Sequence, residues 1–257
     1  MNVDTIYVLS WNAVALAAAI TLMAGFVKGA VGFAMPMIMI SGLGSFMPPE
    51  LALAGLIVPT LLSNLWQALR QGPRAAAASA RVHWRYLAIL LAMILVTAQF
   101  VMSLPTSALL LILGVPVTLF ALLQLIGWKP RIHDGNRRAA ELGVGAFAGG
   151  IGGLSGVWGP PTVLYLTALD TPKTEQVRVQ GVIYGLGAVM LTLAHVQSGL
   201  LNRDTAELSF LLAVPALIGV ALGFAVHDRL DQTLFRKITL FVLVIAGLNL
   251  VRRGMFG

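Results

Sequence analysis

Two short stretches of this chain combine glycine, proline and one lysine in a pattern that suits the binding of a small anion. Three glycines and a proline recur at a constant offset of 124 positions: Gly25, Gly29, Gly32 and Pro36, then Gly149, Gly153, Gly156 and Pro160. Glycine tolerates unusual backbone dihedrals and proline is favoured in the first turn of a helix, so each stretch predicts a break followed by a short helix. A helix start presents amide hydrogens and partial positive charge to an anion. Lys28 adds a full positive charge to the first stretch.

Other polar and aromatic residues complete the candidate site. Asn64, Gln180 and Tyr184 lie in the apolar segments that follow the two short helices, where a polar side chain without a partner is costly. Ser155 adds a hydroxyl to the second stretch, and Phe33 and Trp158 can wall a cavity. The predicted substrate-binding residues are Lys28, Gly29, Gly32, Phe33, Pro36, Asn64, Gly153, Ser155, Gly156, Trp158, Gly159, Pro160, Gln180 and Tyr184.

The glycines and Lys28 also have a purely structural interpretation. Small residues four positions apart let two transmembrane helices approach closely, and Gly25 with Gly29, like Gly149 with Gly153, has that spacing. The long side chain of Lys28 can alternatively extend to the inner membrane surface. The sequence leaves both interpretations open.

The chain lacks residues that many enzymes and metalloproteins use. It contains no cysteine, which excludes thiol catalysis, thiolate metal sites and disulfides, and its four histidines are scattered without ligand spacing. Every Asp and Glu lies at or near the end of an apolar segment, so we expect no buried carboxylate relay. We predict that the protein is not an enzyme and has no catalytic residues, no metal and no cofactor.

The composition is that of a polytopic membrane protein. Hydrophobic residues make up 58% of the chain, charged residues 11%, and the mean hydropathy is +0.88. Segments of 17 to 25 apolar residues can cross the bilayer. We predict an all-α fold with eight long segments near 8–27, 51–69, 84–103, 106–127, 139–155, 177–198, 208–226 and 233–251, and two half-length helices, 36–46 and 160–169.

The basic residues predict two copies of opposite orientation. If each short segment ends on the side opposite its start, 14 of the 17 Lys and Arg residues share one side, which the positive-inside rule makes cytoplasmic. The amino terminus is then periplasmic, and the copies form an inverted repeat. Arg252 and Arg253 are exceptions at the external carboxyl end. The predicted parts are a first membrane repeat (1–128), a basic cytoplasmic linker (129–138) and a second membrane repeat (139–257).

The two stretches resemble those of the TauE/SafE family, often called sulfite exporters. The resemblance rests on Gly25-Phe-Val-Lys-Gly-Ala-Val-Gly-Phe-Ala-Met-Pro36 and Gly149-Gly-Ile-Gly-Gly-Leu-Ser-Gly-Val-Trp-Gly-Pro160, each followed by an apolar run. It implies a multi-pass carrier of the bacterial inner membrane that exports sulfite or organosulfonates such as sulfoacetate. Alternating access between the two sides would move the anion. The residues from Phe33 to Met35, Trp158 and Pro160 stand where the family commonly has glycine, which bears on the identity of the anion.

The expected partners are a small anion and membrane lipid. The sequence is compatible with a homodimer, and we expect no binding of nucleic acid. Two alternative functions remain open. One is an anion channel. The other is a rhomboid-like intramembrane serine protease, because Gly153-Leu154-Ser155-Gly156 resembles the rhomboid serine motif and His195 could act as its base. The first copy has Val31 at the place of Ser155, so the repeat preserves the glycines and not a nucleophile.

Overall fold

The computed structural model describes residues 10–128, 131–171, 173–226 and 232–256, and every regular element in these ranges is helical. In chain order the α-helices are α2 (Trp11–Val31), α3 (Met35–Leu43), α4 (Pro49–Leu69), α5 (Pro73–Val82), α6 (Trp84–Ala98), α7 (Thr106–Leu125), α8 (Arg137–Ser155), α9 (Gly159–Ala168), α10 (Lys173–Gln197), α11 (Arg203–Val226) and α12 (Gln232–Phe256). The predicted all-α class is confirmed.

Seven of the described helices are long and apolar enough to cross a membrane: α2, α4, α6 with the turn that follows it, α7, α10, α11 and α12. The chain is therefore a multi-pass membrane protein. The eighth predicted span, 139–155, is helix α8, which begins with charged residues and contains six glycines among its 19 residues, so it lacks a comparable apolar run. The two predicted short helices are α3 and α9. Helix α5, within the basic loop 70–85, is an element that the hydropathy pattern did not predict.

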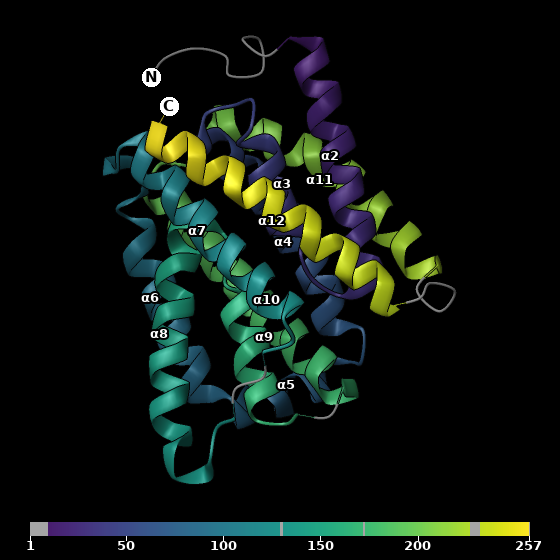
Figure 1. The fold of residues 1–257 in the computed structure, drawn as a ribbon, viewed down its shortest axis with the longest axis vertical. Coiled ribbons are helices and arrows are strands. Elements are labelled where there is room, and N and C mark those ends of the chain that lie inside the picture. Colours follow the sequence, from purple (N-terminus) through teal and green to yellow (C-terminus); the bar gives the residue numbers. More distant parts are fainter. Residues whose placement is uncertain (1–9, 129–130, 172, 227–231, 257) are drawn as a thin grey trace.

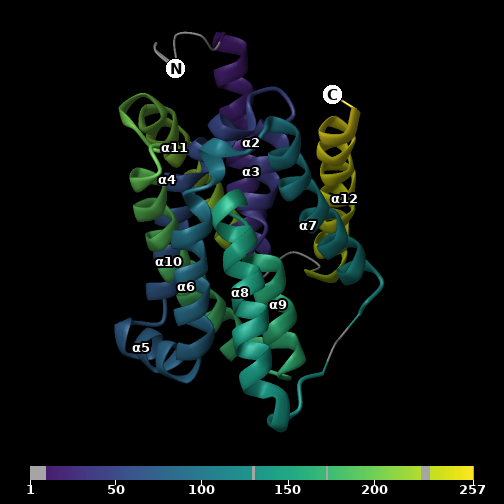
Figure 2. The ribbon, with the colours of Figure 1, turned by 90° about the vertical axis from the view of Figure 1, so that its left-hand side faces the viewer.

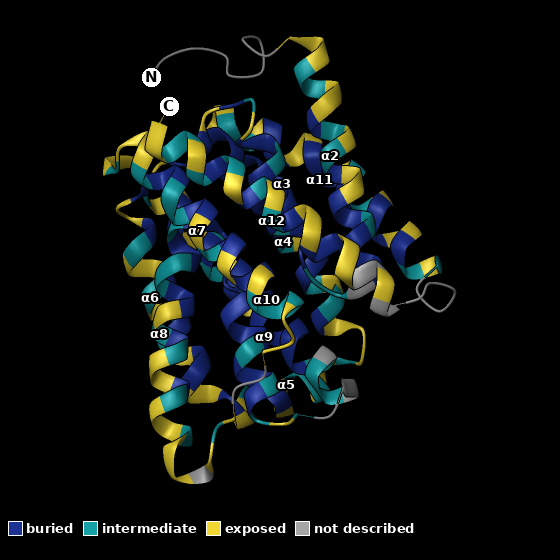
Figure 3. Ribbon diagram, in the orientation of Figure 1, coloured by how far each residue is buried: buried dark blue, intermediate teal, exposed yellow. Residues whose placement is uncertain are grey.

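The surface of the helices is apolar where they face outward. Figure 3 shows exposed residues along the outer sides of α2, α8 and α12, and buried residues between the helices. Phe147, Val214 and Phe241 are each at least 60% exposed. Large apolar side chains in such positions fit contact with lipid tails, since the helices satisfy their own backbone hydrogen bonds.

The helices fall into two sets of five with the same order. Helices α2, α3, α4, α6 and α7 correspond in turn to α8, α9, α10, α11 and α12, and α5 has no counterpart. In Figures 1 and 2, α2 runs inward from the end of the molecule that carries the N and C labels, whereas α8 runs inward from the opposite end. This arrangement agrees with two antiparallel copies. We propose that the division lies at 129–138, although α8 already begins at Arg137.

The two sets interlock through their first and fourth helices. Helix α2 packs along α11, and the equivalent helix α8 packs along α6. A Cβ atom on Gly25 or Gly29 would overlap a carbonyl oxygen of α11, and one on Gly149 or Gly153 would overlap a carbonyl oxygen of α6. These glycine pairs therefore allow close helix packing, as their spacing indicates.

Each set breaks after its first helix. The breaks cover 32–34 and 156–158, and they begin where Gly32 and Gly156 adopt left-handed φ angles of +85° and +70°. Pro36 and Pro160 then lie in the first turn of the next helix, where their missing amide hydrogen breaks no helical hydrogen bond.

The far ends of both short helices are held by the segment that ends the other set. The guanidinium of Arg253, near the end of α12, donates to the carbonyl oxygen of Gly44 at the end of α3. The N–H of Ile132, just after α7, donates to the carbonyl oxygen of Ala168 at the end of α9, at 2.8 Å. Positive groups stabilise helix carboxyl ends, so Arg253 has a structural role that explains its exception to the charge pattern.

Candidate functional site

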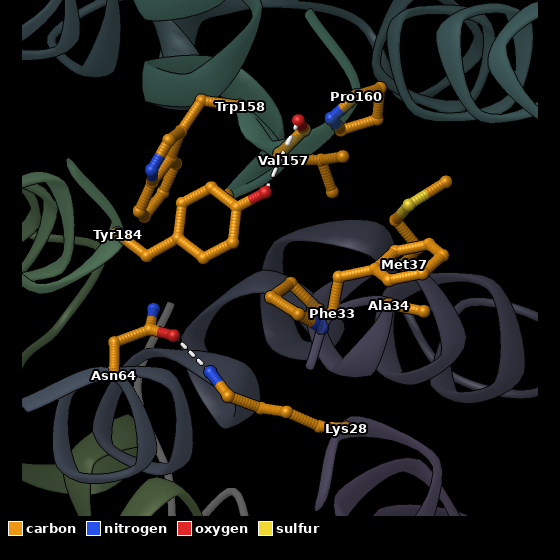
Figure 4. Close-up of a pocket in the computed structure, with 12 residues that line it drawn as sticks. Lys28, Phe33, Ala34, Met37, Asn64, Val157, Trp158, Pro160 and Tyr184 are labelled. Atoms are coloured by element: carbon orange, nitrogen blue, oxygen red, sulfur yellow. Dashed lines mark hydrogen bonds between the residues drawn. The ribbon is translucent and has the colours of Figure 1, made fainter. Parts of the chain in front are cut away.

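A small cavity lies where the two breaks meet helices α4 and α10 (Figure 4). Its lining residues are Lys28, Phe33, Ala34, Pro36, Met37, Asn64, Gly156, Val157, Trp158, Gly159, Pro160 and Tyr184. The cavity measures about 30 Å³, which is roughly two to three times the minimum that one water molecule needs. Two stretches far apart in the sequence thus line one cavity.

Lys28 supplies the only cationic side chain among these lining residues. It lies in the last turn of α2, and its ammonium group donates a hydrogen bond to Oδ1 of Asn64 on α4. Both residues are 2% exposed. The amide of Asn64 is neutral, and none of the ion pairs found among the described residues includes Lys28. A buried ammonium with this partner can bind a negatively charged group, because buried charges require compensation.

The rest of the cavity wall is largely aromatic and aliphatic. Trp158 is 2% exposed, and its indole packs so closely on Gly187 of α10 that a side chain there would collide with the ring. The hydroxyl of Tyr184 donates to the carbonyl oxygen of Gly159 at 3.4 Å and links α10 to the start of α9. Phe33 packs edge-on against Phe120 of α7, with 6.4 Å between the ring centroids.

The two copies contribute different chemistry at matching positions. The constant offset pairs Lys28 with Gly152 and Ala34 with Trp158. The side chain of Trp158 packs against Gly152, with Cβ of Trp158 3.1 Å from where a Cβ of Gly152 would lie. The indole therefore fills the space that a lysine side chain would need in the second copy. The result is a cavity with one cationic side and one aromatic side.

Nine of the fourteen predicted site residues line this cavity: Lys28, Phe33, Pro36, Asn64, Gly156, Trp158, Gly159, Pro160 and Tyr184. Five are elsewhere. Gly29 and Gly153 lie in helix contacts, and Gly32 lies in the first break with open space beside it. Ser155 closes the end of α8, with its hydroxyl donating to Ile151 O at 2.7 Å. Gln180 is buried on α10 outside the lining. Binding by any of the fourteen stays a prediction.

Three lining residues were not predicted: Ala34, Met37 and Val157. Each is a direct neighbour of a predicted residue within the same break or short helix. Their apolar side chains have no chemical signature in a sequence that is largely apolar. Their positions next to Phe33, Pro36 and Trp158 in the sequence were the one indication that they line the cavity.

Ser155 and His195, the nucleophile and base of the protease alternative, make hydrogen bonds to different partners. The Ser155 hydroxyl also accepts a hydrogen bond from Val157 N at 3.1 Å. His195 is fully buried on α10, with Nδ1 3.3 Å from the hydroxyl of Ser198. The hydrogen bonds of these described residues do not join Ser155 to His195, so they form no nucleophile and base pair of the kind that serine hydrolysis uses.

Among the described acidic residues, Glu141 is buried, which its place near a segment end did not indicate. Glu141 lies near the start of α8, as its position suggested, but it is 1% exposed. Its carboxylate accepts hydrogen bonds from Arg137 at 3.0 Å and Arg85 at 3.4 Å, and from the hydroxyl of Tyr165 at 3.4 Å. The cluster ties α9 to α6 and α8, so the packing of three helices removes the carboxylate from water.

His83 extends this cluster at the start of α6. Its Nδ1 lies 3.1 Å from the hydroxyl of Tyr165, and the residue is 3% exposed. Burial lowers the pKa of His83, and the nearby charge of Arg137 lowers it further, whereas Glu141 and Glu175 act in the opposite direction. Desolvation is the largest of these effects, because it disfavours the charged imidazolium.

Comparison with known proteins supports one family. No curated protein and no solved structure matches the chain. The family model described as sulfite exporter TauE/SafE matches residues 17–250, a range that includes both breaks and every residue of the cavity. Members of this family are exporter-type membrane transporters for sulfite and related sulfur anions. The chain therefore belongs to the sulfite exporter TauE/SafE family.

Proposed function

We propose that this protein exports small sulfur-containing anions, such as sulfite or organosulfonates, by alternating access, with the anion bound beside Lys28 between the two breaks. The observation that supports the proposal is the buried ammonium of Lys28, which lines the cavity and has the neutral Asn64 as its hydrogen-bond acceptor. Transfer of an unpaired charge into a protein interior is strongly unfavourable. An anion in the cavity would offset that cost through charge-assisted hydrogen bonds.

The arrangement of the two copies supports a carrier. In inverted-repeat transporters the substrate binds at discontinuous helices near the middle of the membrane, between two halves that move against each other. Here the cavity lies at two such breaks, one from each set of helices. Because the cavity measures only about 30 Å³, a substrate larger than a few waters enters after its walls move apart.

We propose an orientation with the amino terminus in the periplasm of a bacterial inner membrane. The basic loop 70–85 and the described part of the basic linker lie at the end of the molecule away from the N and C labels (Figure 2). The positive-inside rule then assigns that end to the cytoplasm. In this orientation a membrane potential favours outward movement of one negative charge by about 2.3 kcal/mol per 100 mV.

The test is sulfite efflux from proteoliposomes that contain either the natural chain or Lys28→Met. Lys237→Met is the matched control, because it removes the same charge from an exposed position on α12. We expect saturable efflux for the natural chain and the control, and at least a tenfold loss for Lys28→Met. Unchanged efflux in Lys28→Met would contradict the proposed site. A flux that never saturates would instead support the anion channel.

A further inference from the structure

We infer that the cavity selects organosulfonates with one charged head and an apolar body, in preference to inorganic oxyanions and to sulfonates that carry a second charge. This inference rests on the proposed function and narrows its substrate class. It follows from the uneven distribution of polar groups around the cavity, which Figure 4 displays.

The positive charge and its amide partner lie on one side of the cavity. In Figure 4, Lys28 and Asn64 lie together on one side of the cavity, with Trp158, Val157 and Pro160 across from them. A sulfonate head beside the Lys28 ammonium would therefore direct its carbon body toward the apolar wall. Burial of that body is favourable, because apolar surface leaves water on both the ligand and the wall.

The start of α9 offers fewer amide hydrogens than an ordinary helix. Pro160 and Pro161 have none, so Gly159 is the one residue of the first three positions of α9 with an amide hydrogen to donate. Pro36 removes another donor from the first turn of α3. An inorganic oxyanion has polar oxygens on every side. Those that face the wall would have the indole N–H of Trp158 as the one side-chain donor without a partner there, and the others would lose their hydrogen bonds to water.

A second charge on the ligand would also lack a partner. Besides Lys28, three of the twelve lining residues have polar side-chain atoms: Asn64, Tyr184, whose hydroxyl donates to Gly159 O, and Trp158, whose buried indole N–H has no hydrogen-bond partner in the structure. None of the twelve is acidic, so an ammonium group would find no carboxylate. A carboxylate at the far end would face the same wall with no cation. An ammonium group would be desolvated without compensation, and a carboxylate would have at most the neutral indole N–H of Trp158 as a donor.

Space for a longer body lies directly behind the wall. An apolar groove of about 380 Å³ is formed by α7, α8 and α9, and it opens on the outer, lipid-facing surface, since Leu119 and Phe147 in its lining are 55% and 61% exposed. Pro160 lines both the cavity and this groove. A modest movement at the start of α9 would therefore extend the binding site into apolar space and not into water.

The test compares ligands on the purified chain in nanodiscs by ligand-induced thermal stabilisation, read as dissociation constants. Ethanesulfonate, taurine and sulfoacetate carry a sulfonate on a short carbon chain and end in a methyl, an ammonium and a carboxylate group. We expect ethanesulfonate to bind at least tenfold more tightly than the other two and than sulfite. Each methylene added from methanesulfonate to propanesulfonate should tighten binding about fourfold. In Met37→Gln, which places an amide in the wall, this gain should shrink.

The outcomes separate this inference from the proposed function. If sulfite, taurine or sulfoacetate binds more tightly than ethanesulfonate, and Lys28→Met weakens that binding, the site is correct and the inferred selectivity is wrong. If Lys28→Met leaves the binding of every sulfur anion unchanged, the proposed site fails and the inference fails with it. If Met37→Gln does not fold, the ligand series on the natural chain still decides between these results.

Discussion

The pairing of Lys28 with Asn64 makes a quantitative prediction about stability. In Asn64→Leu the buried ammonium loses its acceptor, while a side chain of similar size keeps the packing on α4. A hydrogen bond to a charged group contributes about 1.5–3 kcal/mol, and its loss inside the protein also leaves the ammonium desolvated. We expect Asn64→Leu to lower the free energy of unfolding by about 2–3 kcal/mol. For a chain of this size that is a decrease in Tm of about 4–12 °C.

The same argument predicts a smaller effect for the partner. Lys28→Met removes the buried charge but leaves Oδ1 of the buried Asn64 without its donor, at a cost of about 1–3 kcal/mol that offsets the gain from removing the charge. In the Lys28→Met background, Asn64→Leu no longer strands an ammonium and should have a much smaller effect. The two substitutions should therefore be non-additive by about 1.5–3 kcal/mol.

The measurement is a double-mutant cycle of unfolding, with all four proteins in the same lipid and in buffer without sulfur anions. Asn64→Leu combined with the exposed Lys237→Met is the control pair, and its effects should add within about 0.5 kcal/mol. Additive effects for Lys28 and Asn64 would refute the view that the amide compensates a buried ammonium. The main support for an anion site would then be lost as well.

Two further predictions concern the supports of the site. Arg253→Gln should lower the free energy of unfolding by about 1–2 kcal/mol, because the end of α3 loses a charged hydrogen bond. Arg252→Gln is the control and should have little effect, because the hydrogen bond from Arg252 to Asn249 is exposed. Equal melting temperatures for the two variants would contradict the role of Arg253. Because the pKa of His83 is lowered in the folded protein, the unfolded chain binds a proton at His83 more readily. The stabilisation that comes from the neutral, buried His83 is therefore complete above about pH 6.5 and is lost as the pH falls toward the folded pKa. The free energy of unfolding should fall by up to about 1.4 kcal/mol per pH unit in this range. His83→Gln should flatten that part of the stability profile in thermal unfolding between pH 5 and 8, and identical slopes would show that the imidazole does not contribute.

Glu141 shows why a carboxylate can be misjudged from its place in the chain. Its neighbours in the sequence are the charged start of α8, which suggests contact with water. Arg85 and Tyr165, which come from α6 and α9, enclose it instead. Burial depends on how three helices pack, and a local pattern contains no information on that packing.

The sequence by itself determined the features that depend on local physics. Apolar length predicted the membrane helices, because hydrocarbon requires about 20 residues per crossing. Glycine with positive φ and proline in a first turn are local constraints, so the breaks fall at Gly32 and Gly156, before Pro36 and Pro160. Lys28 and Trp158 could be selected because a charge and a large aromatic ring are unusual among small residues.

Only the tertiary structure decided which of these residues share a cavity. The helix pairing of α2 with α11 and of α8 with α6 turns Gly29 and Gly153 toward another helix and away from the cavity. The acceptor for Lys28 lies 36 positions further along the chain, on α4. Trp158 fills the space beside Gly152, so the cavity is cationic on one side and aromatic on the other. These relations depend on contacts between distant segments, which interlocking of the two copies creates and spacing along one chain does not specify.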